Sequence, residues 1–415
     1  MPSRNKIRTP RVTDDCGPSG DDTSAARSLT ALRIAITAFF AVDGFTFAGW
    51  VVRIPAIKKQ VGASSGALGL ALLGVSAGAV ATMVLTGHLC RRFGSHKVTV
   101  WCAILLGLSV ALPPLTHSAL ALGLVLLVFG AAYGGLNVAM NSAAVDLVAA
   151  LRRPVMPGFH AAFSFGGLAG AGLGALLAPH LSPTRHLLLL TPIALLATTG
   201  AGRILLTHPA PVHPAPVRPA PTEQSPPRPA PARGGVNRLV VVFGLIALCT
   251  AYGEGALADW SALHLTQDLH SGPGLAAASY APFALAMAVG RLTGTALLER
   301  LGRTRTVVLG GATAAAGMLV GALAPWVWLV FAGFAVTGLG LANVFPVAIA
   351  RAGALAGPGG VAAASTLGYG GMLLGPPSIG FLAEVTGLPI ALTTVALLAA
   401  TASAIALAVR DAGHH

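Results

Sequence analysis

Long apolar runs separated by short polar segments make up most of this chain. A helix needs about 20 apolar residues to cross the hydrocarbon core of a bilayer. Runs that meet this requirement cover residues 31–52, 67–87, 98–115, 119–145, 158–179, 186–206, 238–260, 274–297, 306–323, 325–349, 358–382 and 387–409. The pattern predicts an all-α membrane protein with about 12 transmembrane helices.

The composition indicates that lipid, rather than water, is the solvent of this chain. Of its 415 residues, 54% are hydrophobic and 9% are charged, whereas about 25% are charged in soluble domains. The net charge is +13, but the basic residues lie in short segments between the apolar runs, which argues against a nucleic-acid partner. Cys16, Cys90, Cys102 and Cys249 lack the spacing of a zinc site or a disulfide framework, so we expect no metal and no cofactor.

Polar segments divide the chain into two predicted helical bundles. Residues 1–28 contain no apolar run and are predicted to be a disordered cytoplasmic tail. Residues 29–207 and 237–410 are the predicted N-terminal and C-terminal bundles, and 411–415 form a short tail. The Pro/Ala-rich residues 208–236 favour an extended polyproline II conformation, which is typical of a spacer. A partner-binding segment is the alternative.

Basic residues lie mainly on one side of the predicted helices. With the N-terminus inside, the cytoplasmic segments contain Arg4, Lys6, Arg8, Arg11, Arg27, Arg91, Arg92, Lys97, Arg152, Arg153, Arg203, Arg218, Arg228, Arg233, Arg238, Arg300, Arg303, Arg305, Arg351 and Arg410. The opposite side has only Arg53, Lys58, Lys59 and Arg185. Because cytoplasmic loops of membrane proteins carry the excess of Lys and Arg, both termini and the linker are predicted to be cytoplasmic.

The two predicted bundles repeat the same landmarks in the same order. The matched pairs are Asp43-Gly44 with Glu254-Gly255, Trp50 with Trp260, Asn137 with Asn343, and Phe165-Gly166-Gly167 with Tyr369-Gly370-Gly371. A repeat of six spans is even, so both halves enter the membrane from the same side. Such parallel repeats are related by an axis along the membrane normal, and the cavity they share lies on that axis.

A basic loop motif occurs once in each half. It reads GHLCRRFGSHK at residues 87–97 and TALLERLGRTR at residues 295–305. Both copies resemble the loop signature GxLxDRxGRR of the major facilitator superfamily, although Arg91 stands where that signature has an acidic residue and Thr295 replaces its first Gly. The motif positions carried over are Gly87, Arg91, Arg92, Gly94, Glu299, Arg300, Gly302 and Arg303.

Four further segments resemble the fucose permease-like branch of bacterial carriers. They are WVVRIPAIK at 50–58, NVAMN at 137–141, GFHAAFS at 158–164 and EGALADWS at 254–261. The resemblance covers residues 30–410. It implies the major facilitator fold with two parallel six-helix repeats, a multi-pass location in the bacterial inner membrane, and transport by alternating access. Some carriers of that branch move sugars together with protons.

Ionisable residues inside the apolar runs are the candidates for proton coupling. A charged side chain at the centre of a bilayer is costly unless it faces protein or water. Asp43 and Glu254 occupy matched positions in the two halves, and each could carry a proton; a structural hydrogen-bonded clasp is the alternative. His160 titrates near neutral pH and would suit a relay, although a His at a helix end is more often a structural hydrogen-bonding group.

Amide, guanidinium and phenol groups in the apolar runs are the candidates for contact with a solute. They are Asn137, Asn141, Asn343, Arg291, Tyr369 and Tyr252. Amides both donate and accept hydrogen bonds, which suits sugar hydroxyls, but they also join helices within bilayers. Arg291 is either a partner for a carboxylate in the cavity or a side chain that extends to the membrane interface.

Taken with the resemblance, these features predict a secondary active transporter that moves a sugar-like or other small polar solute by proton symport. Proton-driven efflux of a drug or metabolite is the alternative within transport, and a non-transporting membrane sensor is the alternative of another class. No HExxH or similar catalytic motif is present, so we do not expect an enzyme. The expected partners are the solute, protons and the bilayer, with no obligatory protein partner.

Overall fold

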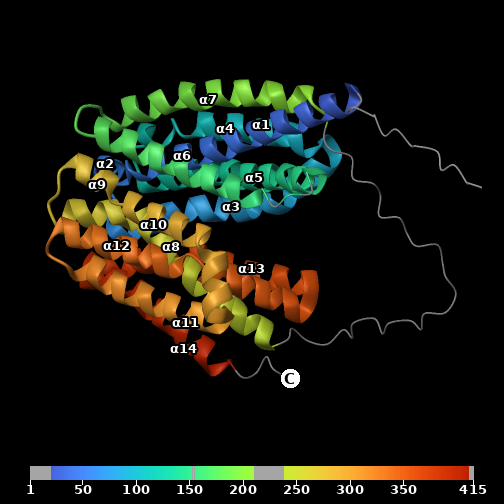
Figure 1. Cartoon of the computed structure of the whole chain (residues 1–415). Helices are drawn as coiled ribbons and strands as arrows, with labels where there is room; N and C mark the ends of the chain where they lie inside the picture. Colours follow the sequence, from blue (N-terminus) through green and yellow to red (C-terminus); the bar gives the residue numbers. More distant parts are fainter. Residues whose placement is uncertain (1–19, 152, 154, 210–237, 411–415) are drawn as a thin grey trace, which may run out of the picture.

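The computed structural model describes residues 20–151, 153, 155–209 and 238–410, and all regular elements among them are helices (Figure 1). The first half contains α1 (Gly20–Val51), α2 (Ile54–Gln60), α3 (Ser65–Phe93), α4 (Ser95–Ser109), the short η1 (Pro113–Leu115), α5 (Ala119–Leu151), α6 (Met156–Leu177) and α7 (Pro183–Thr207). The second half contains α8 (Arg238–Gln267), α9 (Pro273–Ala278), α10 (Ala281–Leu292), α11 (Gly294–Leu323), α12 (Val327–Leu341), α13 (Val344–Thr386) and α14 (Leu388–Ala408).

The two halves form two bundles that lie side by side (Figure 1). Helix α1 begins at Gly20, inside the stretch 1–28 that the sequence analysis assigned to a tail. Residues 1–19, most of the predicted linker 208–236, and residues 411–415 lie outside the described residues. We call the end of the molecule at which α7 ends and α8 begins the tether end, and the opposite end the far end.

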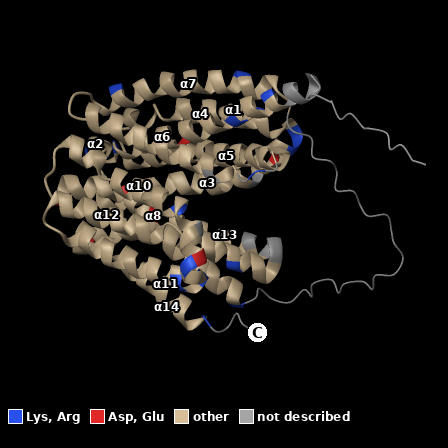
Figure 2. Ribbon diagram, viewed as in Figure 1, with Lys and Arg blue, Asp and Glu red and all other residues tan. Residues whose placement is uncertain are grey.

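Eleven stretches of the described chain are long and apolar enough to cross a membrane. They match the predicted spans except 358–382, which lies within α13. Glycines and the pair Pro376-Pro377 lower the mean hydropathy of that segment. Charged residues lie mostly at the helix ends, with most Lys and Arg at the tether end (Figure 2). The predicted fold class, an all-α membrane protein, is confirmed.

Helix α13 folds back on itself and supplies parts of two spans. Its 43 residues would extend about 65 Å as a straight helix at 1.5 Å per residue. A methyl group on Gly368 would nevertheless lie 2.7 Å from the ring of Phe345, which is 23 residues earlier in the chain. The chain therefore reverses between these residues, and the predicted spans 325–349 and 358–382 run in opposite directions.

The glycine of each loop motif makes the same sharp turn. Gly94, between α3 and α4, has φ 88° and ψ 144°, and Gly302, within α11, has φ 76° and ψ 166°. Residues with a side chain rarely adopt a positive φ of this kind. Gly302 thus splits α11 into the end of one span and the start of the next, as Gly94 does between α3 and α4. The repeat predicted from sequence is visible in the backbone.

Matched helix pairs in the two bundles cross through glycine. In the N-terminal bundle, Gly166 of α6 lies against the carbonyl of Ala41 on α1. In the C-terminal bundle, Gly371 of α13 lies against the carbonyl of Leu248 on α8. Small residues permit this close backbone approach, which supplies much of the packing between helices in a bilayer, where the hydrophobic effect is absent.

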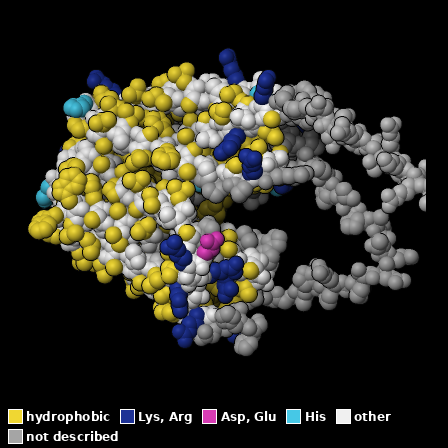
Figure 3. Space-filling model, in the orientation of Figure 1, with side chains coloured by type: hydrophobic (Ala, Val, Ile, Leu, Met, Phe, Trp, Pro, Cys, Tyr) yellow, Lys and Arg dark blue, Asp and Glu magenta, His cyan; other side chains and the backbone are white. Residues whose placement is uncertain are grey.

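The bundles touch at the far end and separate toward the tether end, where the space-filling view shows a recess between them (Figure 3). At the far end, α3 and α13 approach until backbone meets backbone. Gly69 of α3 lies against the Pro376 carbonyl, and a methyl group on Gly380 would lie 2.6 Å from the Ser65 carbonyl oxygen. The molecule is therefore closed at the far end and open at the tether end.

Candidate solute cavity between the bundles

A cavity of about 240 Å³ lies between the two bundles. Ligand pockets for drug-sized molecules usually measure roughly 300–1,000 Å³, so this space suits a small solute. The N-terminal bundle contributes Phe47, Leu72, Val75, Ser76, Ala79, Val80, Met83, Tyr133, Gly134, Asn137 and Phe163. The C-terminal bundle contributes Glu254, Gly255, Ala258, Asp259, Tyr280, Tyr369 and Met372.

Helix α8 brings two carboxyl groups to the cavity. Glu254 and Asp259 are five residues apart, so Asp259 lies about 7.5 Å closer to the far end along the helix axis. The Oε1 atom of Glu254 accepts a hydrogen bond of 2.9 Å from Nη2 of Arg291 on α10. Arg291 is thus bound to a carboxylate that borders the cavity, but its own side chain is 40% exposed and is not among the residues that line the cavity.

Asp259 differs from Glu254 in having no partner. No hydrogen bond or ion pair joins its carboxyl group to another described residue, and its side chain is partly exposed. The described residues that line the cavity include no Lys, Arg or His. Sequence reasoning quoted Asp259 within the segment EGALADWS but did not select it. Its position as an ionisable residue inside an apolar run was the available signal.

Aromatic rings form much of the remaining wall. Tyr133 of α5 stacks on Phe47 of α1, with ring centroids 5.1 Å apart. Tyr280, between α9 and α10, packs beside Phe283, and Tyr369 of α13 borders the cavity from the same bundle. Three tyrosines and Asn137 therefore supply hydroxyl and amide groups at the cavity. Of these, sequence reasoning selected Asn137 and Tyr369 and missed Tyr133 and Tyr280.

Asp43 and His160 do not line the cavity in this conformation. Asp43 is fully buried within the N-terminal bundle, and neither of its carboxyl oxygens has a hydrogen-bond partner among the described residues. His160 of α6 is exposed and packs edge-on against Phe40, with ring centroids 5.3 Å apart. The matched sequence positions of Asp43 and Glu254 therefore have different surroundings in the two bundles.

The asparagines also have different surroundings. Asn137 borders the cavity, and Asn141 donates a hydrogen bond of 2.8 Å to its backbone carbonyl. Asn343 is buried at the start of α13, where Nδ2 donates to the Gly290 carbonyl at 2.8 Å. Outside the cavity, Asn141 thus joins one helix turn to the next, and Asn343 joins one helix to another.

Tyr252 likewise joins helices. Its hydroxyl lies 3.1 Å from Oγ of Ser378 on α13 and 3.0 Å from Oγ1 of Thr394 on α14. The side chain is 5% exposed and does not border the cavity. In this conformation it connects α8 to the two helices that follow α12, which is the contact of a structural residue rather than of a solute ligand.

At the far end, a carboxylate crosses from one bundle to the other. The Oε1 atom of Glu384 on α13 accepts a hydrogen bond of 2.9 Å from the backbone N–H of Gly66, in the first turn of α3. Ser64 caps the same turn by accepting from the N–H of Ala67. Lys58 lies close enough to Glu384 to interact with it electrostatically. We call Glu384 and the first turn of α3 the far-end latch.

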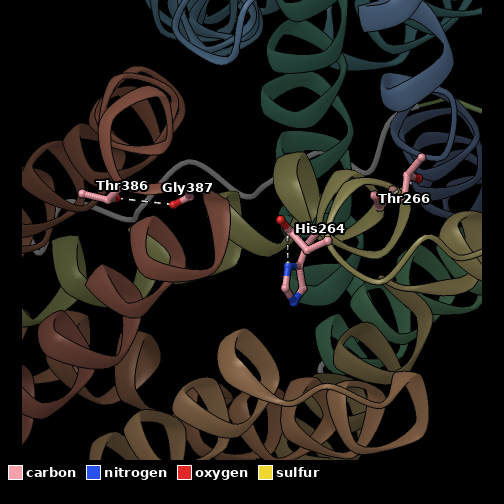
Figure 4. A network of polar contacts seen from close by, with 6 residues as sticks. His264, Thr266, Thr386 and Gly387 are labelled. Carbon is pink, nitrogen blue, oxygen red and sulfur yellow. Dashed lines mark hydrogen bonds and ion pairs between the residues drawn. The ribbon is translucent and has the colours of Figure 1, made fainter.

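Two further polar contacts at the far end stay within the C-terminal bundle. His264 and Thr266 lie in the last turns of α8, and Thr386 and Gly387 lie where α13 ends and α14 begins (Figure 4). The Nδ1 atom of His264 is 2.8 Å from Oδ2 of Asp268, and Thr266 donates to the Ala262 carbonyl. These hydrogen bonds stabilise the end of a single helix. The hydrogen bond of the far-end latch, in contrast, must break if the bundles separate at this end.

Replacing Glu384 with Gln is expected to weaken closure at the far end. Hydrogen bonds from the Ser64 side chain and the Gly66 backbone hold the pKa of Glu384 below its usual value. Because the pKa of Glu384 is lowered in the closed state, its ionised side chain stabilises that state at pH values above the usual glutamate pKa of about 4.3. This stabilisation is lost as the pH falls through the lowered pKa. Closure should therefore persist at neutral pH in the unmodified protein and decline in Glu384→Gln.

Spin labels at Lys59 and Gln267, which are exposed at the far end of opposite bundles, would measure this closure as a distance distribution. Glu299→Gln, at the exposed loop motif of the tether end, is the matched control. Equal distance distributions in the unmodified protein and in Glu384→Gln at pH 7 would contradict the latch.

Comparison with known proteins shows which sequences and folds this chain resembles. The sequence profile of the Major Facilitator Superfamily matches residues 34–294. An uncharacterized MFS-type transporter from Yersinia pestis is 34% identical over 381 residues, which cover 90% of this chain and 94% of that protein. Two solved structures share the fold. A bacterial homolog of the human lysosomal transporter Spinster, inward-facing and unoccupied, has a TM-score of 0.71, with 15% identity over 92% of this chain and 97% of its own. The nucleoside transporter NupG has a TM-score of 0.67, with 14% identity over 92% and 99%.

Proposed function

This chain belongs to the Major Facilitator Superfamily and is a multi-pass membrane transporter, and we propose that it carries a small polar solute by proton-coupled alternating access. The observation that carries the proposal is the cavity between the bundles, whose wall includes Glu254, the carboxylate partner of Arg291. A site at the interface of two repeats becomes accessible from each side in turn as the bundles rock.

Glu254 is the proposed coupling residue. Its carboxylate pairs with Arg291 in the conformation that is open at the tether end. Protonation of Glu254 removes the charge that holds the guanidinium, so proton uptake and release change the contacts between α8 and α10. The ion pair is the deprotonated state expected after the proton has left toward the tether end. His160, exposed on α6, is a candidate relay on that route.

The solute is proposed to bind at Asn137, Tyr369 and the two further tyrosines of the wall, Tyr133 and Tyr280. Their hydroxyl and amide groups match a sugar-like or other polar solute. The segment EGALADWS, which resembles the fucose permease-like branch, places both of its acidic residues at the cavity, and this supports the branch assignment as part of the proposal.

The proposed location is a bacterial inner membrane with both termini and the linker in the cytoplasm. The support is the excess of Lys and Arg at the tether end (Figure 2). With this orientation, the conformation described here is open to the cytoplasm, and the far-end latch closes the outer side. The loop motifs around Gly94 and Gly302 then form the cytoplasmic turns of the two bundles.

Proteoliposomes with an imposed pH gradient test this function. Pooled sugars, polyols, acids and drugs are screened for solute-dependent proton movement and for counterflow. We expect Glu254→Gln to abolish uphill transport and solute-driven proton movement while counterflow continues, because an uncharged side chain binds solute but carries no proton. Asp43→Asn is the matched control, since Asp43 is enclosed in the N-terminal bundle.

The outcomes separate the alternatives. Proton movement that persists in Glu254→Gln contradicts the coupling role of that residue. Counterflow without proton movement in the unmodified protein indicates a facilitator or exchanger. Solute movement opposite to the proton gradient indicates efflux, and solute binding without any flux indicates a sensor.

A further inference from the structure

The charges at the cavity do not balance. Glu254 and Asp259 each contribute a carboxyl group to the wall, and Glu254 is paired with Arg291, a residue outside the cavity lining. No Lys, Arg or His is among the described residues of the wall. With both acids ionised, the wall therefore carries one negative charge that no group of the protein compensates.

The position of Asp259 allows a ligand to compensate this charge. Asp259 borders the cavity and is partly exposed, whereas the carboxyl oxygens of Asp43 are fully enclosed. An ionised carboxylate away from bulk water is costly unless it is paired and hydrogen-bonded. A positively charged group of the solute, placed beside Asp259, would be that partner.

The surrounding rings favour a cation as well. Tyr133, Tyr280 and Tyr369, together with Phe47 and Phe163, present aromatic surface to the space beside α8. The face of an aromatic ring attracts an ammonium group, and the attraction is stronger where water is excluded. An anionic solute would meet the opposite situation, since it would face the unpaired carboxylate without a basic residue to bind it.

We infer that the solute carries one protonated amine and that Asp259 is the counter-charge that selects it. The inference rests on the proposed function and narrows its substrate class to small polar amines, such as amino sugars or amino polyols. Asn137 and the tyrosine hydroxyls remain available for the hydroxyl groups of such a molecule. Neutral sugars lack the group that pairs with Asp259, and sugar phosphates carry the wrong charge.

The charge preference of the cavity can be measured without knowing the solute. Ser76 borders the cavity from α3, and Ser76→Cys is introduced into a full-length variant in which the four native cysteines are replaced by Ser or Ala. The rates of modification by a cationic and an anionic methanethiosulfonate reagent are then compared. We expect the cationic reagent to react faster, and this preference to collapse in Asp259→Asn. Asp43→Asn is the matched control and should keep the preference.

Protection of the same cysteine tests the amine. Glucosamine and glucamine are compared with their uncharged counterparts, glucose, N-acetylglucosamine and sorbitol, as protectants against a neutral thiol reagent. We expect the amines to protect at lower concentration than the uncharged molecules, and this difference to disappear in Asp259→Asn.

Either of two results overturns the inference. One is equal reaction with the cationic and anionic reagents, and the other is equal or better protection by the uncharged molecules. If solute counterflow is nevertheless seen in proteoliposomes, the proposed transport function stands and only the restriction of the solute to amines is withdrawn. If the cavity instead selects cations but no solute shows counterflow, the transport proposal fails and the role of Asp259 is supported.

Discussion

Replacing Gly69 with Leu is expected to hold the far end open and to abolish net transport. A Cβ atom at this position would lie against the Pro376 carbonyl and 3.1 Å from Cα of Pro377. These are backbone atoms of the opposite bundle, which cannot rotate away as a side chain would. The bundles must therefore separate where α3 now meets α13. Because the clash lies between bundles, each bundle keeps its own packing and the protein should still fold.

The spin-label pair at Lys59 and Gln267 measures this separation. Gly69→Leu should shift the distribution to longer distances, and solute flux in proteoliposomes should fall to background. Gly172→Leu on α6 is the control, because no neighbouring atom lies within 4 Å of a Cβ built there. Unchanged distances together with intact transport in Gly69→Leu would show that closure at this contact is not part of the transport cycle.

Replacing Gly130 with Val is expected to prevent folding rather than to trap a conformation. Gly130 of α5 lies against the carbonyl of Val75 on α3, and a Cβ atom would come within 2.6 Å of the Val75 carbonyl carbon. Both helices belong to the N-terminal bundle, so the strain cannot be relieved by movement between bundles. Overpacking of this kind costs about 1–3 kcal/mol and sometimes more, a large share of a typical stability of about 5–15 kcal/mol.

The yield of monodisperse protein in detergent and its unfolding temperature measure the effect. Gly123→Ala on the same helix is the control, since its Cβ would make an ordinary contact of 3.4 Å with Cα of Ala71. We expect Gly130→Val to reduce both quantities and Gly123→Ala to change them little. Normal yield and unfolding temperature in Gly130→Val would mean that α3 and α5 can move apart at little cost.

The two glycines show what a sequence pattern leaves open. Gly69 and Gly130 lie in similar apolar runs, and nothing in their neighbours along the chain distinguishes them. Only the tertiary structure shows that the first lies between bundles and the second within one. The same change of size is therefore expected to alter a conformational equilibrium at one position and the stability of the fold at the other.

The sequence also treated Asp43 and Glu254 as equivalent because the repeat aligns them. In the structure, Asp43 is enclosed while Glu254 borders the cavity and binds Arg291. Asn137 and Asn343 diverge in the same way, one at the cavity and the other in a hydrogen bond to Gly290. A repeat fixes the helix on which a residue lies, but the rotation and packing of that helix decide what its side chain meets.

By itself, the sequence determined the all-α membrane fold and the approximate positions of the membrane-spanning helices. Both follow from a local property, the length of the apolar run that a helix needs to cross a bilayer. Only the tertiary structure decided which acid binds Arg291, which acid is left unpaired and where the bundles close. Those outcomes depend on contacts between helices far apart in the chain, such as Glu384 with Gly66, and no local pattern encodes such distances.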